Sequence, residues 1–168
     1  MRWVDRAFDF SFPVEMFASV LERLRGAPAR LEEKLRSLDR ATLTRSAGDS
    51  WSIQEHAGHL LDLDELHIAR LDDYEAGAPV LSAADMENRK TFEANHNARP
   101  FEEIVSDFRR ERGAFVARLE TWPEDRRGAS AIHPRLNRPM RVVDMAYFVA
   151  EHDDHHLARM TELAAKSD

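Results

Sequence analysis

The stretch "SWSIQEHAGHLLDLDELHIARLDDYEAGAP", Ser50 to Pro79, contains the clearest helix signal of the chain. Ser52 and Glu55 have the spacing of a capping box, in which each side chain binds the backbone N–H of the other residue. Gly77 follows the last residue of the helical pattern and provides a stop signal. We therefore predict a helix over residues 53 to 76.

Apolar residues recur at helical spacing in other parts of the chain as well. One run ends at Gly26 and another follows Pro28, so these two runs form either one kinked helix or two. Further helices are predicted between Pro100 and Pro123 and over residues 142 to 165. Residues 123 to 140 contain three prolines and a glycine, and we expect a loop there. The pattern predicts an all-α fold, a helical bundle with ligand sites between facing helices.

Composition restricts the class of protein. A chain of 168 residues is expected to form a single domain, residues 1–168. Its net charge of −7 leads us to exclude nucleic acid as a partner, because such binding depends on clustered Lys and Arg. Without cysteine the chain has neither a disulfide nor a thiolate ligand. No apolar stretch is long enough for a signal peptide or a membrane span, so we expect a cytoplasmic protein without a membrane partner.

The segment "VAEHDDHHLARM", Val149 to Met160, places histidines inside an apolar helical stripe. His152 and His156 are one turn apart and therefore face the same way. They occupy positions of an apolar helix face that runs from Met145 to Leu163. Two buried imidazoles need polar partners, and one shared cation would satisfy both. The alternative is that they are core residues with hydrogen-bond partners in the protein and bind no metal.

A metal site would need a third ligand from elsewhere in the chain. The helix predicted over residues 53 to 76 offers three candidates, and spacing alone does not choose among His56, His59 and His67. Three histidine ligands leave coordination positions free for water or substrate, which is typical of a catalytic zinc site.

The acidic residues and the third histidine near these candidate ligands are expected to have supporting or surface roles. Either Asp153 or Asp154 is expected to orient a ligand, and His155 is expected at the flank of the helix. The acidic side chains of the earlier helix, including Asp64, are expected to form a solvated face.

Two segments, Ser50–His67 and Ile132–His156, resemble the signature regions of the DinB/YfiT-like superfamily of metalloenzymes. The most specific parts are W-S-x-x-E-x-x-x-H-L at Trp51–Leu60 and H-D-x-x-H at His152–His156. The resemblance covers residues 28 to 165, and the His133-Pro134 pair also matches a family pattern.

The resemblance implies a four-helix bundle of up-down-down-up type, to which we add a short N-terminal helix. It also implies a divalent metal ion, zinc or nickel, held by His59, His152 and His156. His56 and His67 then have packing or pocket-lining roles.

Several functions occur among proteins that the chain resembles. They include S-transferases and isomerases that use bacillithiol, mycothiol or glutathione, and metal-dependent hydrolases. The first hypothesis is a metal-dependent enzyme that activates a low-molecular-weight thiol for S-transfer to an electrophilic small molecule. The alternatives are a hydrolase that uses metal-bound hydroxide, and a non-catalytic bundle stabilised by its metal. The resemblance is also compatible with a homodimer.

Overall fold

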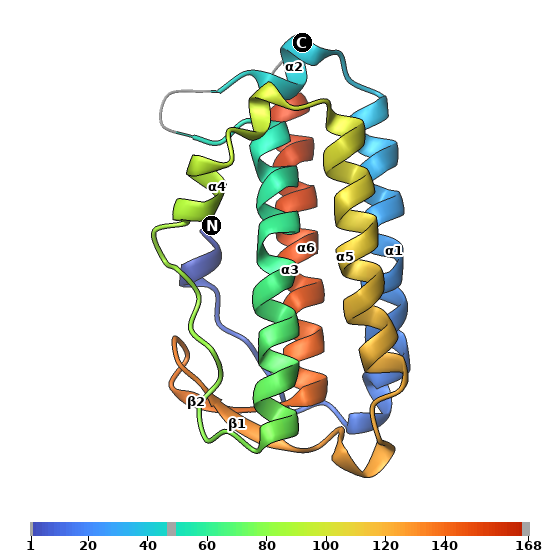
Figure 1. Ribbon diagram of the computed structural model, residues 1–168, viewed down its shortest axis with the longest axis vertical. Helices are drawn as coiled ribbons and strands as arrows, with labels where there is room; N and C mark the ends of the chain where they lie inside the picture. The colour runs from blue at the N-terminus through green and yellow to red at the C-terminus, as the bar shows by residue number, and fades with distance from the viewer. Residues whose placement is uncertain (1, 47–49, 166–168) are drawn as a thin grey trace.

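Four long helices lie side by side and make up most of the protein (Figure 1). The computed structural model describes residues 2–46 and 50–165. The helices are α1 (Phe17–Arg36), α2 (Arg40–Thr44), α3 (Ile53–Ala76), α4 (Arg89–Glu93), α5 (Phe101–Glu120) and α6 (Val142–Ala164). Helices α1 and α3 each pack against both α5 and α6. The prediction of a mainly helical fold is confirmed, whereas a single domain over residues 1–168 stays a prediction.

Helix α3 begins and ends where its capping residues predict. The Ser52 hydroxyl accepts the Glu55 N–H at 3.1 Å, and the Glu55 carboxylate accepts the Ser52 N–H at 2.7 Å. Gly77 ends the helix in the left-handed region, with φ of 67°. The boundaries predicted for α3, residues 53 and 76, are confirmed. They could be predicted because the capping signals depend only on residues close in the sequence.

The N-terminal apolar runs form one helix rather than two. Helix α1 passes through Gly26 and Pro28 without a break. Pro28 cannot donate a helical backbone hydrogen bond, yet the helix continues because its apolar side is buried against the core on both sides of this residue. The predicted short N-terminal helix is reduced to two single turns of 3-10 helix, Trp3–Asp5 and Val14–Met16.

A β-hairpin forms in the segment that was expected to be a loop. Strands β1 (Ser130–His133) and β2 (Arg138–Arg141) are antiparallel, so the all-α prediction is wrong at this point. Pro139 lies opposite Ile132, whose N–H and carbonyl instead bind the backbone of Pro79 and Leu81. The proline therefore removes no hydrogen bond from the strand pair.

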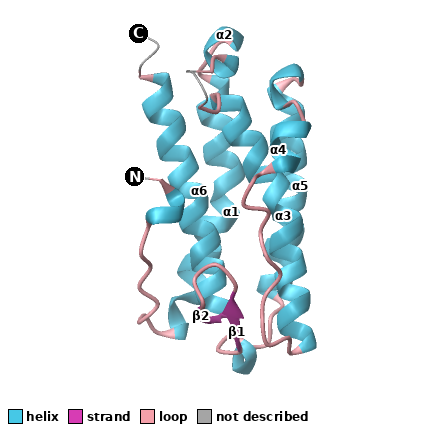
Figure 2. Cartoon of the chain, turned by 90° about the vertical axis from the view of Figure 1, so that its left-hand side faces the viewer, coloured by secondary structure: helices cyan, strands magenta, loops and turns pink. Residues whose placement is uncertain are grey.

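The chain between α3 and α5 returns along α3 and carries α4 and the turn His96–Ala98 (Figures 1 and 2). The His96 ring lies directly over Gly58, where a Cβ atom would be only 2.1 Å from the ring. The His96 Nε2 atom is also 2.9 Å from the Asp62 carboxylate. Glycine at position 58 thus allows this returning segment to lie close to α3.

The interior contains a buried ion-pair cluster as well as apolar side chains. Arg112 of α5 donates hydrogen bonds to Asp64 of α3, at 2.9 and 3.1 Å, and to Asp153 of α6. The three side chains are at most 1% exposed. The expectation that Asp64 lies on a solvated face is therefore wrong, because a cation from another helix neutralises it inside the bundle.

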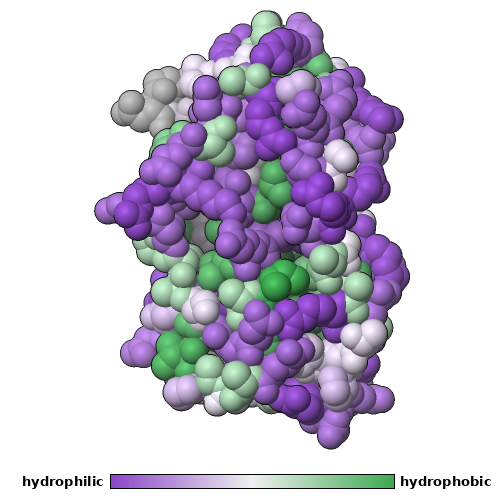
Figure 3. Space-filling view, in the orientation of Figure 1, coloured by the Kyte–Doolittle hydropathy of each residue, from purple (hydrophilic) through white to green (hydrophobic). Residues whose placement is uncertain are grey.

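The outer surface agrees with helices that bury their apolar sides. The face shown in Figure 3 is mostly hydrophilic, and hydrophobic residues gather near its middle. Within residues 2–46 and 50–165, no helix is both long and apolar enough to cross a lipid bilayer.

Candidate metal centre

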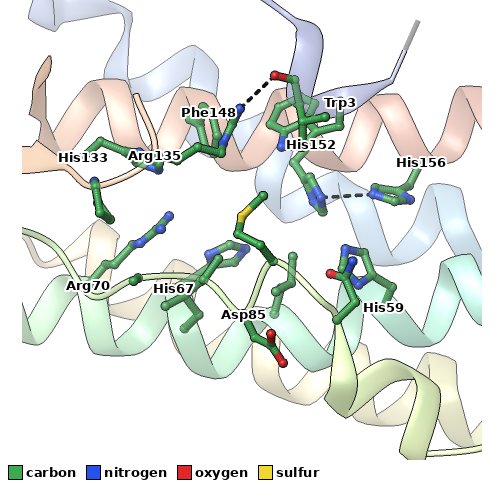
Figure 4. A pocket seen from close by; sticks show the side chains of 18 of the residues that line it. Trp3, His59, His67, Arg70, Asp85, His133, Arg135, Phe148, His152 and His156 are labelled. Atoms are coloured by element: carbon green, nitrogen blue, oxygen red, sulfur yellow. Dashed lines mark hydrogen bonds between the residues drawn. The ribbon is translucent and has the colours of Figure 1, made fainter. Parts of the chain in front are cut away.

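Three buried histidines meet where α3 faces α6 (Figure 4). His59 comes from α3, and His152 and His156 come from successive turns of α6. One ring nitrogen of each lies within 4.8 Å of the others. The two α6 rings converge because residues four apart share a helix face, and their Nε2 atoms are 3.0 Å apart.

Polar neighbours hold two of these rings in place. The His59 Nδ1 atom lies 3.1 Å from the Thr91 hydroxyl, which leaves Nε2 on the opposite side of the ring. The His156 Nδ1 atom lies 2.8 Å from His56 Nδ1. Hydrogen bonds of this kind fix the orientation of a metal-binding imidazole. The Nδ1 atom of His152 is buried and has no hydrogen-bond partner among the described residues.

Two tryptophans shield the histidines from water. The Trp51 ring centroid lies 4.6 Å from that of His59, and the Trp51 ring stacks on His156 at 6.2 Å. Trp3, from the N-terminal segment, contacts His152 edge to face at 4.9 Å. The histidines are consequently only 4–5% exposed.

This burial keeps the imidazoles neutral. Removal from water lowers the pKa of His59 to about 4. It also holds the pKa values of His152 and His156 well below 6.5, and the neighbouring histidines add to the effect. At neutral pH each ring therefore has a nitrogen lone pair available for a metal ion.

The donor set fits a divalent metal ion. Tetrahedral coordination with bonds of about 2.0–2.1 Å separates two ligand nitrogens by about 3.3 Å. The separation of 3.0 Å between the Nε2 atoms of His152 and His156 is close to this value. Two unprotonated nitrogens at this distance repel each other unless a proton or a cation lies between them. Imidazole nitrogens suit zinc and nickel, as well as copper and iron.

A cavity of about 450 Å³ opens beside the three histidines. Its wall includes Leu66, Met86 and Phe148, together with buried His67. The Nδ1 atom of His67 has no partner within the described part of the chain, and burial lowers its pKa well below 6.5. The cavity thus offers an apolar chamber with a neutral histidine next to the candidate ligands.

The structure brings His59, His152 and His156 together. It gives His56 and His67, the other two candidates on α3, different positions. His56 contacts His156 from behind, and His67 lines the cavity. Sequence reasoning did not identify Thr91 or Trp3, which approach from other segments and carry no motif.

The acidic residues of α6 do not orient the histidines. Asp153 binds Arg112, and Asp154 binds Arg23 and Arg30. The prediction that one of them supports a ligand is therefore wrong, because arginines from α1 and α5 take up both carboxylates.

Comparison with known proteins identifies the family. The family model of the DinB superfamily matches residues 21–160. The chain belongs to the DinB superfamily. Among curated proteins, none matches it.

Two solved structures share the fold of this DinB-superfamily chain. The first is YfiT from Bacillus subtilis, described as "a probable metal-dependent hydrolase with an unusual four-helix bundle topology". It has a TM-score of 0.83 at 17% identity, and the match covers 96% of this chain and 93% of YfiT. The second is the colibactin self-resistance protein ClbS in complex with double-stranded DNA, with a TM-score of 0.65 at 14% identity. That match covers 88% of this chain and 94% of ClbS. The up-down-down-up order of helix directions stays a prediction.

The ClbS complex corrects the expectation that nucleic acid is excluded as a partner. A protein with this fold is bound to double-stranded DNA, so the fold is compatible with nucleic acid. The exclusion was based on the net charge of −7, which averages over the whole surface. Binding to phosphates depends on the local arrangement of charge, so the average does not decide it.

Proposed function

We propose that His59, His152 and His156 bind a divalent metal ion, zinc or nickel, and that the protein is a metal-dependent hydrolase. The observation that carries this proposal is the convergence of three neutral, buried imidazoles beside a cavity of about 450 Å³. The likeness in fold to YfiT, described as a probable metal-dependent hydrolase, supports hydrolysis as the reaction.

The residues at this site would have different roles. The three histidines hold the metal, while Thr91 and His56 keep the rings of His59 and His156 oriented. When bound, the metal would act as a Lewis acid and lower the pKa of a coordinated water molecule. The tryptophans exclude bulk water, which strengthens electrostatic interactions inside the site.

The cavity would bind an organic substrate next to the histidines. Leu66 and Phe148 offer apolar contacts, and His67 offers a neutral hydrogen-bonding group. The chain has no cysteine, so a thiol nucleophile would have to be borrowed, whereas a water molecule is available from solvent. Hydrolysis needs no partner beyond water, whereas the S-transfer reaction predicted from the sequence needs a low-molecular-weight thiol.

A hydrolysis assay with the metal-loaded protein tests this proposal. Activated esters, amides and phosphoesters are offered with and without added glutathione. We expect turnover without thiol, loss of turnover with a chelator or with His152→Ala, and retention with His155→Ala. His155 is the matched control because it lies on α6 next to the candidate ligands but is only half-buried.

The other outcomes of the assay are distinct. A product that forms only with thiol would replace hydrolysis by S-transfer. Bound metal without turnover, together with unfolding on chelation, would indicate a non-catalytic bundle stabilised by its metal.

A further inference from the structure

A group of cationic and polar side chains lines the cavity away from the three histidines of the candidate metal centre. Arg70 comes from α3, and His133 and Arg135 come from the β-hairpin and its turn. In Figure 4 these three side chains lie at one side of the pocket and the metal-centre histidines at the other, with His67 between them. One cavity therefore connects two chemically different ends.

Arg70 is buried without a carboxylate partner. Its side chain is 2% exposed, and it forms no ion pair within the described residues. The Nε atom donates to the carbonyl of Ser82 at 3.0 Å, which is a neutral acceptor. Asp73 is close enough to influence the pKa of Arg70, but its carboxylate accepts the Ser82 N–H instead. Desolvation of an unpaired cation is costly unless a ligand neutralises it.

The hairpin adds two further hydrogen-bond donors without partners. Arg135 donates through Nη1 to the Val4 carbonyl at 3.2 Å, while its Nη2 atom is buried with no partner in the described part of the chain. The Nδ1 atom of His133 accepts the Leu136 N–H at 3.2 Å, so a neutral His133 carries its proton on Nε2. That Nε2 atom is also buried and lacks a partner among the residues described.

The charged Arg70 and Arg135 side chains repel each other in the absence of an anion, and burial together with their charge keeps His133 neutral. Burial, followed by the charge of Arg135, lowers the pKa of Arg70 to about 10, so the guanidinium stays charged at neutral pH. Burial and then the two arginines lower the pKa of His133 to about 4. The one carboxylate that lines this cavity among the described residues, Asp85, is exposed and pairs with Arg89. Within residues 2–46 and 50–165, no carboxylate thus forms an ion pair with either guanidinium group.

We propose that Arg70, Arg135 and His133 form an oxyanion subsite that binds a carboxylate or phosphate group of the cavity's ligand. Guanidinium groups match the planar geometry of such anions and form charge-assisted hydrogen bonds with them. This inference rests on the proposed function in one respect: it assigns to the substrate an anionic group at this end and the bond to be cleaved at the metal end.

Titration of the full-length protein with acetate and with inorganic phosphate tests the subsite directly. Binding is followed by tryptophan fluorescence, to which Trp3 and Trp51 of the same cavity contribute, in a buffer with chloride as the only other anion. We expect saturable binding of at least one anion, weakened about tenfold or more by Arg70→Gln and by Arg135→Gln. The preferred anion identifies the source as a carboxylate or a phosphate. Arg138→Gln is the matched control, since Arg138 is an exposed arginine of the same hairpin.

The His152→Ala variant separates this inference from the proposed function. Anion bound at the arginines persists in this variant, whereas anion bound at the metal is lost with it. The subsite is disproved if neither anion saturates the wild-type protein, or if both arginine variants bind with unchanged affinity. Either result leaves the metal content and the hydrolysis assay unaffected.

Discussion

Two arginines are buried in this molecule to almost the same extent, but their surroundings differ. Arg112 is 1% exposed, binds Asp64 and Asp153, and lies over the Phe108 ring at 4.7 Å. Arg70 is 2% exposed, and the only partner of its side chain in the described chain is a backbone carbonyl. One guanidinium is neutralised by the protein, and the other is left for a ligand.

This difference separates structural stabilisation from ligand binding. The Arg112 cluster joins α3, α5 and α6 through one cation and two carboxylates, with no access to the cavity. Arg70 and the candidate metal ligands line the cavity. Its wall also contains buried polar atoms that have no partner in the described part of the chain, namely His67 Nδ1, His133 Nε2, Arg135 Nη2 and His152 Nδ1. Buried polar atoms in native proteins are normally paired, so groups without partners at a cavity indicate where a ligand binds.

Replacing Arg112 should have the largest effect on stability. Arg112→Met leaves the buried carboxylates of Asp64 and Asp153 without a counter-charge, and the free energy of unfolding should fall by about 3–5 kcal/mol. Urea denaturation measures this change. Arg118→Met serves as the control, because Arg118 is a more exposed arginine of α5 whose ion pairs should contribute less than about 1 kcal/mol. An equal loss in the two variants would contradict the structural role of the cluster.

Removing the hydroxyl behind His59 should affect the ligand rather than the fold. Thr91→Val deletes the hydrogen bond to His59 Nδ1, and the affinity for a divalent metal should fall about tenfold to a hundredfold. The free energy of unfolding of the metal-free protein should change by less than about 1.5 kcal/mol, as for one hydrogen bond. Competition with a chromophoric chelator measures the affinity. Unchanged affinity would show that Thr91 does not orient the ring.

Replacing Arg70 should cost little stability, in contrast to Arg112. Arg70→Met removes an unpaired buried cation together with one hydrogen bond to the Ser82 carbonyl, and these effects oppose each other. The free energy of unfolding should stay within about 1 kcal/mol of the wild-type value. The same urea experiment measures it, and a loss as large as that of Arg112→Met would mean that Arg70 stabilises the fold.

The smallest expected effect is on the titration of His133. Its pKa of about 4 results first from burial and then from Arg70 and Arg135. The unfolded chain therefore takes up a proton near pH 6.5, before the folded protein does, and stability is lost as the pH falls from about 6.5 to about 4. Arg70→Met removes one of the two charges and should therefore raise the pKa of His133 part of the way from about 4 toward 6.5. NMR titration of the His133 ring measures it, Arg138→Met is the control, and no change would show that the two groups do not interact.

Local signals made several features predictable from the sequence. The capping box at Ser52 and the glycine at position 77 determine both ends of α3, and spacing places His152 and His156 on one face of α6. The choice of His59 as the third candidate ligand depended on family resemblance, because His56 and His67 lie on the same helix.

Features that depend on distant partners were not predicted. The hairpin needs pairing between residues 130–133 and 138–141 and a bridge to Val80, and the prolines obscured its strands. The sequence around Asp64 suggests an exposed acid, but in the fold Arg112 of α5 pairs with it inside the bundle. Arg70 looks like an ordinary surface arginine until packing buries it beside the cavity. In each case the environment is determined by tertiary packing.

The metal content of the purified protein is the most direct test of the central claim, that unpaired polar groups at the cavity are held for ligands. The protein is purified without an affinity tag, supplied with zinc and nickel, and analysed by inductively coupled plasma mass spectrometry. We expect about one divalent ion per chain in the wild type and in His155→Ala, and almost none in His152→Ala with its helical circular dichroism intact. A wild-type protein without bound metal, or a His152→Ala variant that retains it, would show that these histidines are not held for a metal ion.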